Sequence, residues 1–215
     1  MWHIESFVFS PIQENTYLLY TNDRRAVIID PGCYFEEERT ALKARINTLQ
    51  LNPVALWNTH THLDHVFGNQ FVYQTWGLEA HIHPEEDPVL DAAPAYGLMY
   101  NLPVETYTGT RLYLADRQVL AVGDSQLEVI HAPGHSPGSV CFYSADQGFL
   151  IGGDVLFHRS IGRTDLPGGH HATLIQSIQQ RLMVLPDHTV VYSGHGEPTT
   201  IGEERQENPF LYGLT

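Results

Sequence analysis

The chain has 215 residues, with 11 basic and 25 acidic side chains and a formal net charge of −14. This length suits one sizeable domain whose core is large enough to need no disulfide. An acidic surface repels phosphate backbones, which argues against a nucleic-acid substrate. No secretory leader and no membrane-spanning apolar run is evident, and the two distant cysteines are typical of reduced thiols, so we expect a cytoplasmic protein without a membrane contact.

Short apolar runs alternate with helical patterns and with Gly or Pro turns along the chain, which is typical of an α/β protein. Residues 84–109 contain four prolines and are predicted to form a long loop or lid. In chain order we expect strands at 16–20 and 26–29, a helix at 36–47, a strand at 54–58, a helix at 64–76, a strand at 79–82, strands at 127–131, 140–143 and 149–151, a helix at 172–185, and a strand at 189–193.

One segment, His60-Thr61-His62-Leu63-Asp64-His65, contains four potential metal ligands in six residues. Imidazoles and carboxylates are the usual ligands of zinc, and imidazole also suits iron. In an extended segment alternate residues share a face, so His60 and His62 can converge on one ion. Asp64 and His65 fall where the chain turns into a helix, and they can reach a second ion. The segment therefore predicts the start of two adjacent metal sites.

Three later residues, His135, Asp154 and His195, each lie just beyond the end of a predicted strand, as His60 does. Strand ends on one edge of a sheet are where loops carry functional residues on a rigid frame. Asp154 is the only acid in these later segments placed to bridge two cations. We therefore predict two ions, one held by His60, His62 and His135, the other by Asp64, His65 and His195, with Asp154 on both.

Such a centre predicts hydrolysis, because a water held between two divalent cations loses a proton near neutral pH. If Asp64 binds one ion through one oxygen, its other oxygen can hold the attacking water, which would make it a catalytic residue. Asp30 is expected to order a turn by accepting backbone hydrogen bonds. Arg163 and Asp165 either pair with each other or orient metal ligands. The pair His81 and His83 resembles a ligand pair but is expected to be structural.

These residues carry a resemblance to the metallo-β-lactamase fold superfamily. The ligand segment at 60–65, the later Gly-His135, Gly-Asp154 and Gly-His195, and the early Ile29-Asp30-Pro31-Gly32 are similar to its motif series, from Asn15 to His195. The resemblance implies a four-layer αββα sandwich over residues 1–215 as a single domain. It also implies that the metals lie at one edge of the β layers.

The segments Gly152-Gly153-Asp154 to Phe157 and Gly162-Arg163-Thr164-Asp165 resemble the glyoxalase II, or hydroxyacylglutathione hydrolase, group, especially its short bacterial members. That resemblance implies hydrolysis of the small-molecule thioester S-D-lactoylglutathione, or a related thioester, to D-lactate and a thiol. A thiol with a pKa of about 8.5 leaves without prior protonation. About 20 residues follow His195, too few for the C-terminal helical glutathione-binding domain of the longer enzymes, so the thiol carrier stays open.

Other members of the fold provide alternatives. The chain also resembles persulfide dioxygenases, in which a single iron would lie on His60, His135 and Asp154, a two-histidine, one-carboxylate set. Leu166-Pro167-Gly168-Gly169 is more similar to the short hydrolases, and favours hydrolysis. The presence of Asp154 argues against the activity of true β-lactamases. The presence of His62 argues against the oxygen-reducing diiron members of the fold. The expected cofactors are two divalent ions, zinc first, although this ligand set also accepts iron or manganese.

Overall fold

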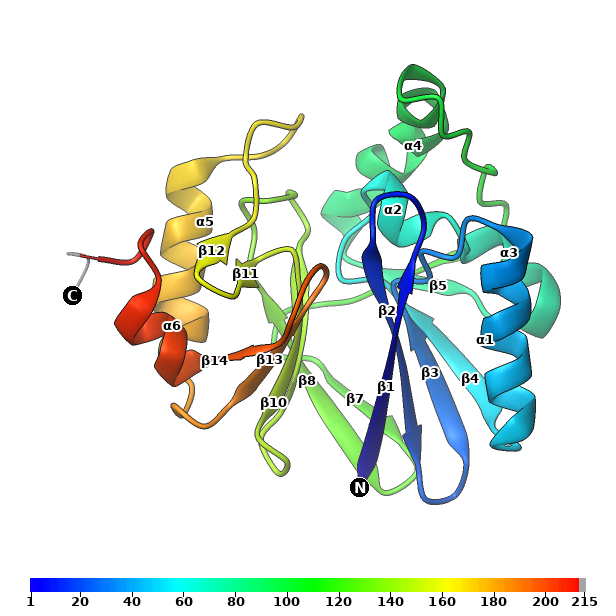
Figure 1. The fold of residues 1–215 in the computed structure, drawn as a ribbon, viewed down its shortest axis with the longest axis horizontal. Coiled ribbons are helices and arrows are strands. Elements are labelled where there is room, and N and C mark those ends of the chain that lie inside the picture. The colour runs from blue at the N-terminus through cyan, green and yellow to red at the C-terminus, as the bar shows by residue number, and fades with distance from the viewer. Residues whose placement is uncertain (213–215) are drawn as a thin grey trace. The chain divides into compact units, whose positions relative to one another are not determined.

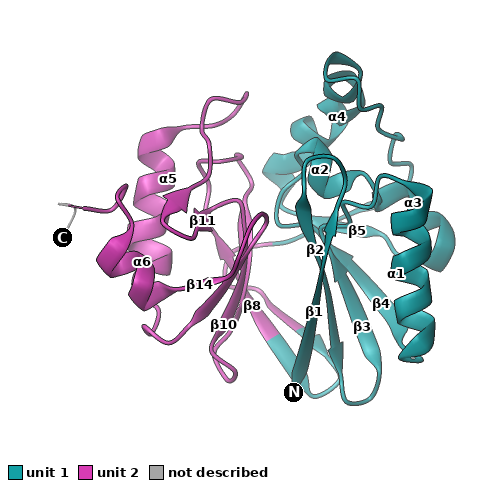
Figure 2. Ribbon diagram, in the orientation of Figure 1, with its two compact units in different colours: residues 1–114, 121–126 teal, residues 115–120, 127–215 magenta. Residues whose placement is uncertain are grey.

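The computed structural model describes residues 1–212 and divides the chain into two compact units (Figure 2). The first unit comprises residues 1–114 and 121–126, and the second comprises residues 115–120 and the described chain from Leu127 onward. The single domain predicted over 1–215 includes residues 213–215, which lie outside the described residues. Within residues 1–212 no helix is long and apolar enough to cross a membrane.

The first unit is built on a six-stranded sheet in which the strands follow their order in the chain. The first three strands pair antiparallel, and the third to the sixth pair parallel. Parallel neighbours end at the same edge, so the residues after β3 and β4, Asp30 and His60, are brought together. The strands are β1 (Trp2–Phe9), β2 (Glu14–Thr21), β3 (Arg25–Ile29), β4 (Asn52–Trp57), β5 (Ala80–Ile82) and β6 (Arg111–Tyr113).

Two helices, α1 (Glu36–Thr48) and α3 (Asn69–Trp76), lie along one face of this sheet (Figure 1). Leu42 of α1 and Val72 of α3 are fully buried in one cluster with apolar residues of the strands. The carboxylate of Glu38 fixes the start of α1, because it accepts the backbone N–H groups of Tyr34 and Phe35 at 2.7 and 2.9 Å. The unit also contains α2 (Leu63–Val66), the 3₁₀ helix η1 (Pro84–Glu86) and α4 (Asp87–Met99).

Most of another six-stranded sheet, in the order β14-β13-β10-β9-β8-β7, belongs to the second unit, together with a small β11-β12 hairpin. Residues 121–126, which end β7 and begin β8, are counted with the first unit. Here β10 runs parallel to β13 and antiparallel to β9, which runs antiparallel to β8. Consequently β8, β10 and β13 all end at one edge. The strands are β7 (Val119–Val122), β8 (Ser125–His131), β9 (Val140–Ser144), β10 (Phe149–Gly153), β11 (Leu156–Phe157), β12 (Ser160–Ile161), β13 (Val190–Ser193) and β14 (Thr199–Thr200).

Two helical segments, α5 (His171–Ser177) and α6 (Ile201–Glu207), belong to this unit, and a π-helical turn, η2 (Ile178–Leu182), continues α5. Leu174, Ile178 and Leu182 are fully buried in one cluster with strand residues such as Leu150 and Val191. Their spacing of four residues places these side chains on one face of the helical segment.

The structure confirms all eight predicted strands, with each boundary within two residues of the expected one, and the helix predicted at 36–47. The single helix predicted at 64–76 is wrong, because the chain forms α2 and α3 with a break at Gly68. There the Gly68 N–H donates to the Pro31 carbonyl at 2.7 Å, and a Cβ on Gly68 would overlap the Cys33 sulfur. The helix predicted at 172–185 starts at His171 and ends at Leu182.

The loop predicted at 84–109 is also wrong, since most of it forms η1 and α4. Two of its prolines, Pro84 and Pro88, lie at the first or second position of these helices, where the backbone N–H group has no partner within the helix. These two prolines therefore mark helix starts, whereas Pro94 lies inside α4. The sequence interpretation also missed β1, β6, β7, β11, β12, β14 and α6.

Candidate metal centre

The ligand segment of the first unit is extended and then helical, as its sequence predicts. His60 lies just beyond β4, His62 has extended backbone angles (φ −60°, ψ 154°) at the start of α2, and Asp64 and His65 lie in α2 itself. The side chains are shielded from solvent: His65 is fully buried, His60 is 1% exposed and Asp64 is 9% exposed. The segment thus brings its ligand atoms into a protected part of the unit.

The three imidazoles of this segment lie close together. The ring centroid of His60 is 4.8 Å from that of His62, with the planes nearly perpendicular, and 4.1 Å from that of His65. The Nε2 atom of His65 is 3.9 Å from an oxygen of Asp64. The residues predicted to begin both metal sites are therefore gathered in one place within the first unit.

Asp30 orients this segment through hydrogen bonds to Thr59 and His65. Its Oδ1 accepts the Thr59 N–H at 2.7 Å, and its Oδ2 accepts the Thr59 hydroxyl at 2.5 Å and lies 3.1 Å from His65 Nδ1. A carboxylate only accepts, so His65 Nδ1 carries the proton. Because the Thr59 hydroxyl donates its hydrogen bond to Asp30, the Thr59 oxygen can only accept from His60 Nδ1, which is 3.1 Å away. In both histidines Nε2 is then left with the lone pair that a metal requires.

The expected turn-ordering role of Asp30 agrees with these contacts, and its backbone supports it. Asp30 has a positive φ of 49°, a conformation that Asp tolerates better than most residues. One ligand atom each of Asp30, His60 and His65 lie within 4.8 Å of one another, close enough to hold an ion. The Asp30 oxygens are already occupied by the Thr59 groups and His65. Asp30 is therefore better suited to orienting ligands than to binding metal.

A buried carboxyl group that the sequence interpretation missed, Glu14, lies beside this arrangement. Its Oε2 accepts the Thr16 hydroxyl at 2.8 Å, and its Oε1 is 3.9 Å from His65 Nδ1 and accepts no hydrogen bond within residues 1–212. Burial holds the pKa of Glu14 well above its usual range; the charge of Asp30 also raises it, whereas His65 lowers it. A Cβ on Gly32 would overlap the Glu14 carboxyl, so this position requires glycine.

The second unit holds the other three predicted ligands at the ends of β8, β10 and β13. Oδ2 of Asp154 is 3.5 Å from Nε2 of His135 and 3.6 Å from Nε2 of His195. The Nδ1 atom of His135 lies 2.8 Å from the main-chain carbonyl of Arg163, so Nδ1 is the donor and Nε2 is directed to Asp154. Asp154 thus lies between the two imidazoles, as a bridging carboxylate would.

Close backbone contacts fix the loop that carries His135. Gly134 has a φ of 130° and lies against the backbone of Leu174 in α5, where a Cβ would overlap. The Ser177 hydroxyl donates to the Pro133 carbonyl, and the His170 N–H donates to the Gly134 carbonyl, both at 2.7 Å. The α5 helix therefore holds this loop at two successive carbonyls.

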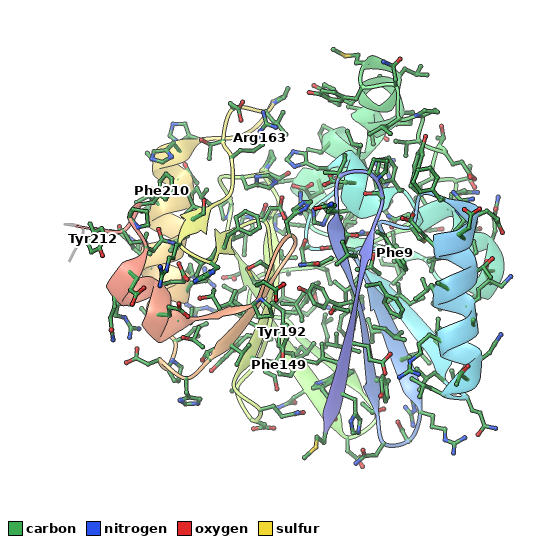
Figure 3. The ribbon with its side chains drawn as sticks, in the orientation of Figure 1. Phe9, Phe149, Arg163, Tyr192, Phe210 and Tyr212 are labelled. Carbon is green, nitrogen blue, oxygen red and sulfur yellow. The ribbon has the colours of Figure 1, made fainter. Side chains whose placement is uncertain are left out.

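Arg163, labelled in Figure 3, lies on the loop after β12. Its side chain pairs with that of Asp165. Their two hydrogen bonds measure 2.7 and 2.8 Å, and both side chains are exposed. The hydrogen bonds from Arg163 lower the pKa of Asp165 to about 2. Arg163 contacts His135 through its carbonyl oxygen, so the ion pair and the orienting contact use different atoms of the same residue.

Three histidines outside the predicted ligand set, His81, His83 and His170, have structural contacts. His81 Nδ1 is 3.1 Å from the Leu56 carbonyl, between neighbouring strands. His83 Nδ1 accepts the Glu85 N–H at 3.4 Å and caps η1, while His170 Nδ1 accepts the Thr173 N–H at 3.2 Å and caps α5. These contacts agree with the structural role expected for the pair at 81 and 83.

The donors in both units fit divalent metal ions. They are imidazole nitrogens and carboxylate oxygens, the donor types that zinc, iron and manganese accept. The Nδ1 atoms of His60, His65 and His135 are each within hydrogen-bond distance of an oxygen, which is how metal-binding histidines are usually oriented. Each unit therefore contributes imidazoles prepared for a cation.

Comparison with known sequences supports this interpretation. Residues 10–195 match the family described as the Metallo-beta-lactamase superfamily. The "Probable metallo-hydrolase YqgX" of Bacillus subtilis is 39% identical over 207 residues, which cover 95% of each chain. The "Hydroxyacylglutathione hydrolase GloC" of Haemophilus influenzae is 37% identical over 211 residues, covering 97% of this chain and 98% of the relative.

Solved structures match over nearly the whole length as well. The structure titled "Crystal structure of BLEG-1 B3 metallo-beta-lactamase" has a TM-score of 0.90 and 40% identity, covering 98% of this chain and all of its own. "Crystal structure of TTHA1623 in a di-iron-bound form" has a TM-score of 0.87 and 36% identity, covering 96% and 100%. The predicted fold class is confirmed as a mixed α/β structure with two sheets, in a group of hydrolase-like, metal-binding enzymes. This chain belongs to the metallo-beta-lactamase superfamily.

Proposed function

We propose that this protein is a metal-dependent hydrolase of thioesters, acting on S-D-lactoylglutathione or a related thioester to give D-lactate and a thiol. The observation that carries this proposal is the position of Asp154 Oδ2, 3.5 Å and 3.6 Å from the Nε2 atoms of His135 and His195. A carboxylate between two imidazoles suits a bridge between two cations. The H. influenzae relative named hydroxyacylglutathione hydrolase supports the choice of substrate.

The proposed centre contains two divalent ions, with zinc as the first candidate and iron or manganese as alternatives. His60, His62 and His135 would hold one ion, and Asp64, His65 and His195 the other, with Asp154 on both. The hydrogen bonds at Nδ1 of His60, His65 and His135 support this assignment, because they leave Nε2 as the ligand atom. The di-iron form of a 36% identical structure supports a two-metal centre.

When bound, two cations supply an acidified water and polarise the thioester carbonyl. Asp64 would orient the attacking water: one of its carboxylate oxygens accepts a hydrogen bond from the water and directs the water toward the carbonyl. Asp64 is 9% exposed, so it is shielded from bulk solvent. The thiolate can leave without an acid from the protein, because the corresponding thiol has a pKa of only about 8.5.

The test is metal analysis of the purified protein, paired with a thioester-hydrolysis assay on S-D-lactoylglutathione. We expect two metal ions per chain and release of D-lactate, with loss of both after chelation and recovery on adding Zn²⁺. Activity on thioesters of several different thiols would identify a broad thioesterase. Two bound metals without hydrolysis of any thioester would contradict the proposed function.

Two alternative functions are tested by the same metal analysis together with assays of oxygen uptake and β-lactam hydrolysis. A persulfide dioxygenase would bind one iron per chain and consume oxygen with a thiol-derived substrate. A β-lactamase would hydrolyse a chromogenic β-lactam, an activity raised by the 40% identical structure titled a B3 metallo-beta-lactamase. We expect neither oxygen uptake nor β-lactam hydrolysis to approach the rate with the thioester.

Three further features belong to the proposal. The substrate is a small molecule, since a net charge of −14 is a poor match for nucleic acid, and no membrane contact is needed. The protein acts in the cytoplasm, where thiols stay reduced. The chain works as one domain.

A further inference from the structure

A second buried carboxylate, that of Glu86, accepts hydrogen bonds from Thr61 in the middle of the ligand segment. It is fully buried at the end of η1, and its Oε2 accepts both the Thr61 N–H, at 2.7 Å, and the Thr61 hydroxyl, at 2.9 Å. The Thr61 hydroxyl also lies 3.2 Å from the Glu86 main-chain oxygen. A carboxylate is expensive to bury unless it is hydrogen-bonded, so these contacts fix the two residues to each other.

Thr61 is the residue between His60 and His62. Its N–H belongs to the peptide group that joins it to His60, and both this N–H and the Thr61 hydroxyl donate to Glu86. Holding both the N–H and the hydroxyl fixes the orientation of this peptide. The direction of the His60 and His62 rings, whose centroids are 4.8 Å apart at 89°, follows from that orientation.

We propose that Glu86 is a positioning residue for the His60–His62 pair, setting the angle at which these imidazoles meet their shared cation. The inference rests on the proposed metal centre and adds a residue that acts on one of its two ions. Asp30 contacts Thr59 and His65 and so reaches both ions. The Glu86 side chain holds Thr61, which lies between His60 and His62, so its influence falls on the ion of these two histidines.

The position of Glu86 in the chain links this ion to α4. Glu86 directly precedes α4, and the next residue, Asp87, is anchored to β6 by Arg111 at 3.0 Å and by the Tyr113 hydroxyl at 2.7 Å. The η1–α4 junction is thus tied to the ligand segment on one side and to the sheet on the other. Any displacement of this junction moves the carboxylate that orients Thr61.

The test is titration of metal-free protein with Co²⁺, followed by its visible absorption, and with Zn²⁺, followed by calorimetry. Glu86→Ala removes the acceptor, so we expect one of two metal equivalents to weaken by about 10- to 100-fold while the other keeps its wild-type affinity. The Co²⁺ spectrum of the weakened site should change as well. Glu86→Gln keeps an acceptor oxygen and should recover most of the lost affinity.

A milder variant and a matched control separate positioning from folding. Thr61→Val keeps the volume and the N–H but loses the hydroxyl, so it should weaken the same equivalent by less than Glu86→Ala does. Glu204→Ala removes another fully buried carboxylate, one that accepts hydrogen bonds from Thr199 and Asn208 in the second unit. It should lower stability while leaving both metal equivalents intact.

The outcomes are decisive in either direction. Wild-type affinity for both equivalents in Glu86→Ala and Thr61→Val would overturn the proposal, and so would an equal weakening of both equivalents. If Glu86→Ala fails to fold, Thr61→Val decides alone. Because the readout is metal binding, the proposal stands if wild-type protein binds two ions and hydrolyses no thioester, a result that would overturn only the proposed function.

Discussion

The two units hold their predicted metal ligands by different means. In the first unit the ligands come from one continuous segment, and two buried side-chain carboxylates, Asp30 and Glu86, bind Thr59 and Thr61, the residues on either side of His60. In the second unit the ligands come from three separate loops, and a main-chain group, the Arg163 carbonyl, orients His135. A side chain can be removed by substitution and a carbonyl cannot. The first unit is therefore expected to be the more sensitive to changes around its ligands.

The largest effect is expected from Asp64→Asn. Asparagine has nearly the same shape but cannot accept a proton, so we expect turnover of the thioester to fall by about 10²- to 10⁴-fold with the thermal midpoint unchanged. The measurement is kcat in parallel with thermal unfolding. Asp146→Asn, at an exposed turn between β9 and β10, is the control. Wild-type turnover in the Asp64 variant would rule out its role in handling the water.

The next largest effect is expected where a buried carboxylate orients the ligands of the first unit. Asp30→Ala leaves the Thr59 N–H and His65 Nδ1 without their acceptor, so we expect affinity for Zn²⁺ to fall by about 10- to 100-fold. Calorimetric titration measures it, with the exposed Asp124→Ala as control. Unchanged affinity would mean that His65 is oriented by other contacts and would remove the contrast between the units.

In the second unit the sensitive positions are glycines rather than carboxylates. A Cβ on Gly162 would overlap the Asp154 carbonyl and crowd His135 Nδ1. Gly162→Ala should therefore lower the free energy of unfolding by about 1–3 kcal/mol, measured in urea, and weaken metal binding. Gly152→Ala is the matched control, because its Cβ would meet nothing nearer than a Val191 methyl group at 3.3 Å. Equal losses in both variants would show that space beside Asp154 is not the cause.

The smallest effect is expected from Arg163→Ala. The carbonyl that accepts from His135 Nδ1 remains, so affinity for Zn²⁺ should stay at the wild-type level. The pKa of Asp165 should rise from about 2 toward its ordinary value of about 3.9, as read by NMR titration. A large loss of metal affinity would mean that the Arg163 side chain orients ligands.

The sign of the Asp165 effect follows from its lowered pKa. Contacts that favour the charged carboxylate stabilise the folded state above the unfolded pKa, and this stabilisation is lost as the pH falls from about 4 to about 2. Since both side chains are exposed, the gain is small. Arg163→Ala should therefore remove a slight pH dependence of stability in this range and leave stability at pH 7 nearly unchanged.

The ligand positions followed from the sequence because strand ends are local features. His60, His135, Asp154 and His195 lie just beyond β4, β8, β10 and β13, as their neighbouring apolar runs predicted. Whether all seven predicted ligands share two ions is not a local property, and it stays a prediction. The helix boundary between α2 and α3 was missed because the break at Gly68 depends on a distant contact with Cys33 and Pro31.

Glu14 and Glu86 could not be found from the sequence for a related reason. The acceptor role of Glu86 depends on Thr61, which is 25 positions away and belongs to another element. Nothing in the local pattern distinguishes Glu86 from its neighbours in Pro84-Glu85-Glu86-Asp87-Pro88, and the prolines favoured a loop. Only the burial of an acid in that run, visible in the structure, indicates its role.

The most direct test of the two-cation centre is anomalous diffraction from crystals of the metal-loaded protein, recorded at the absorption edge of the bound metal. The account predicts two peaks about 3.5–4 Å apart, with Asp154 between them and the other six predicted ligands divided three to each ion. A single peak on His60, His135 and Asp154, with His62, His65 and His195 away from any metal, would contradict it.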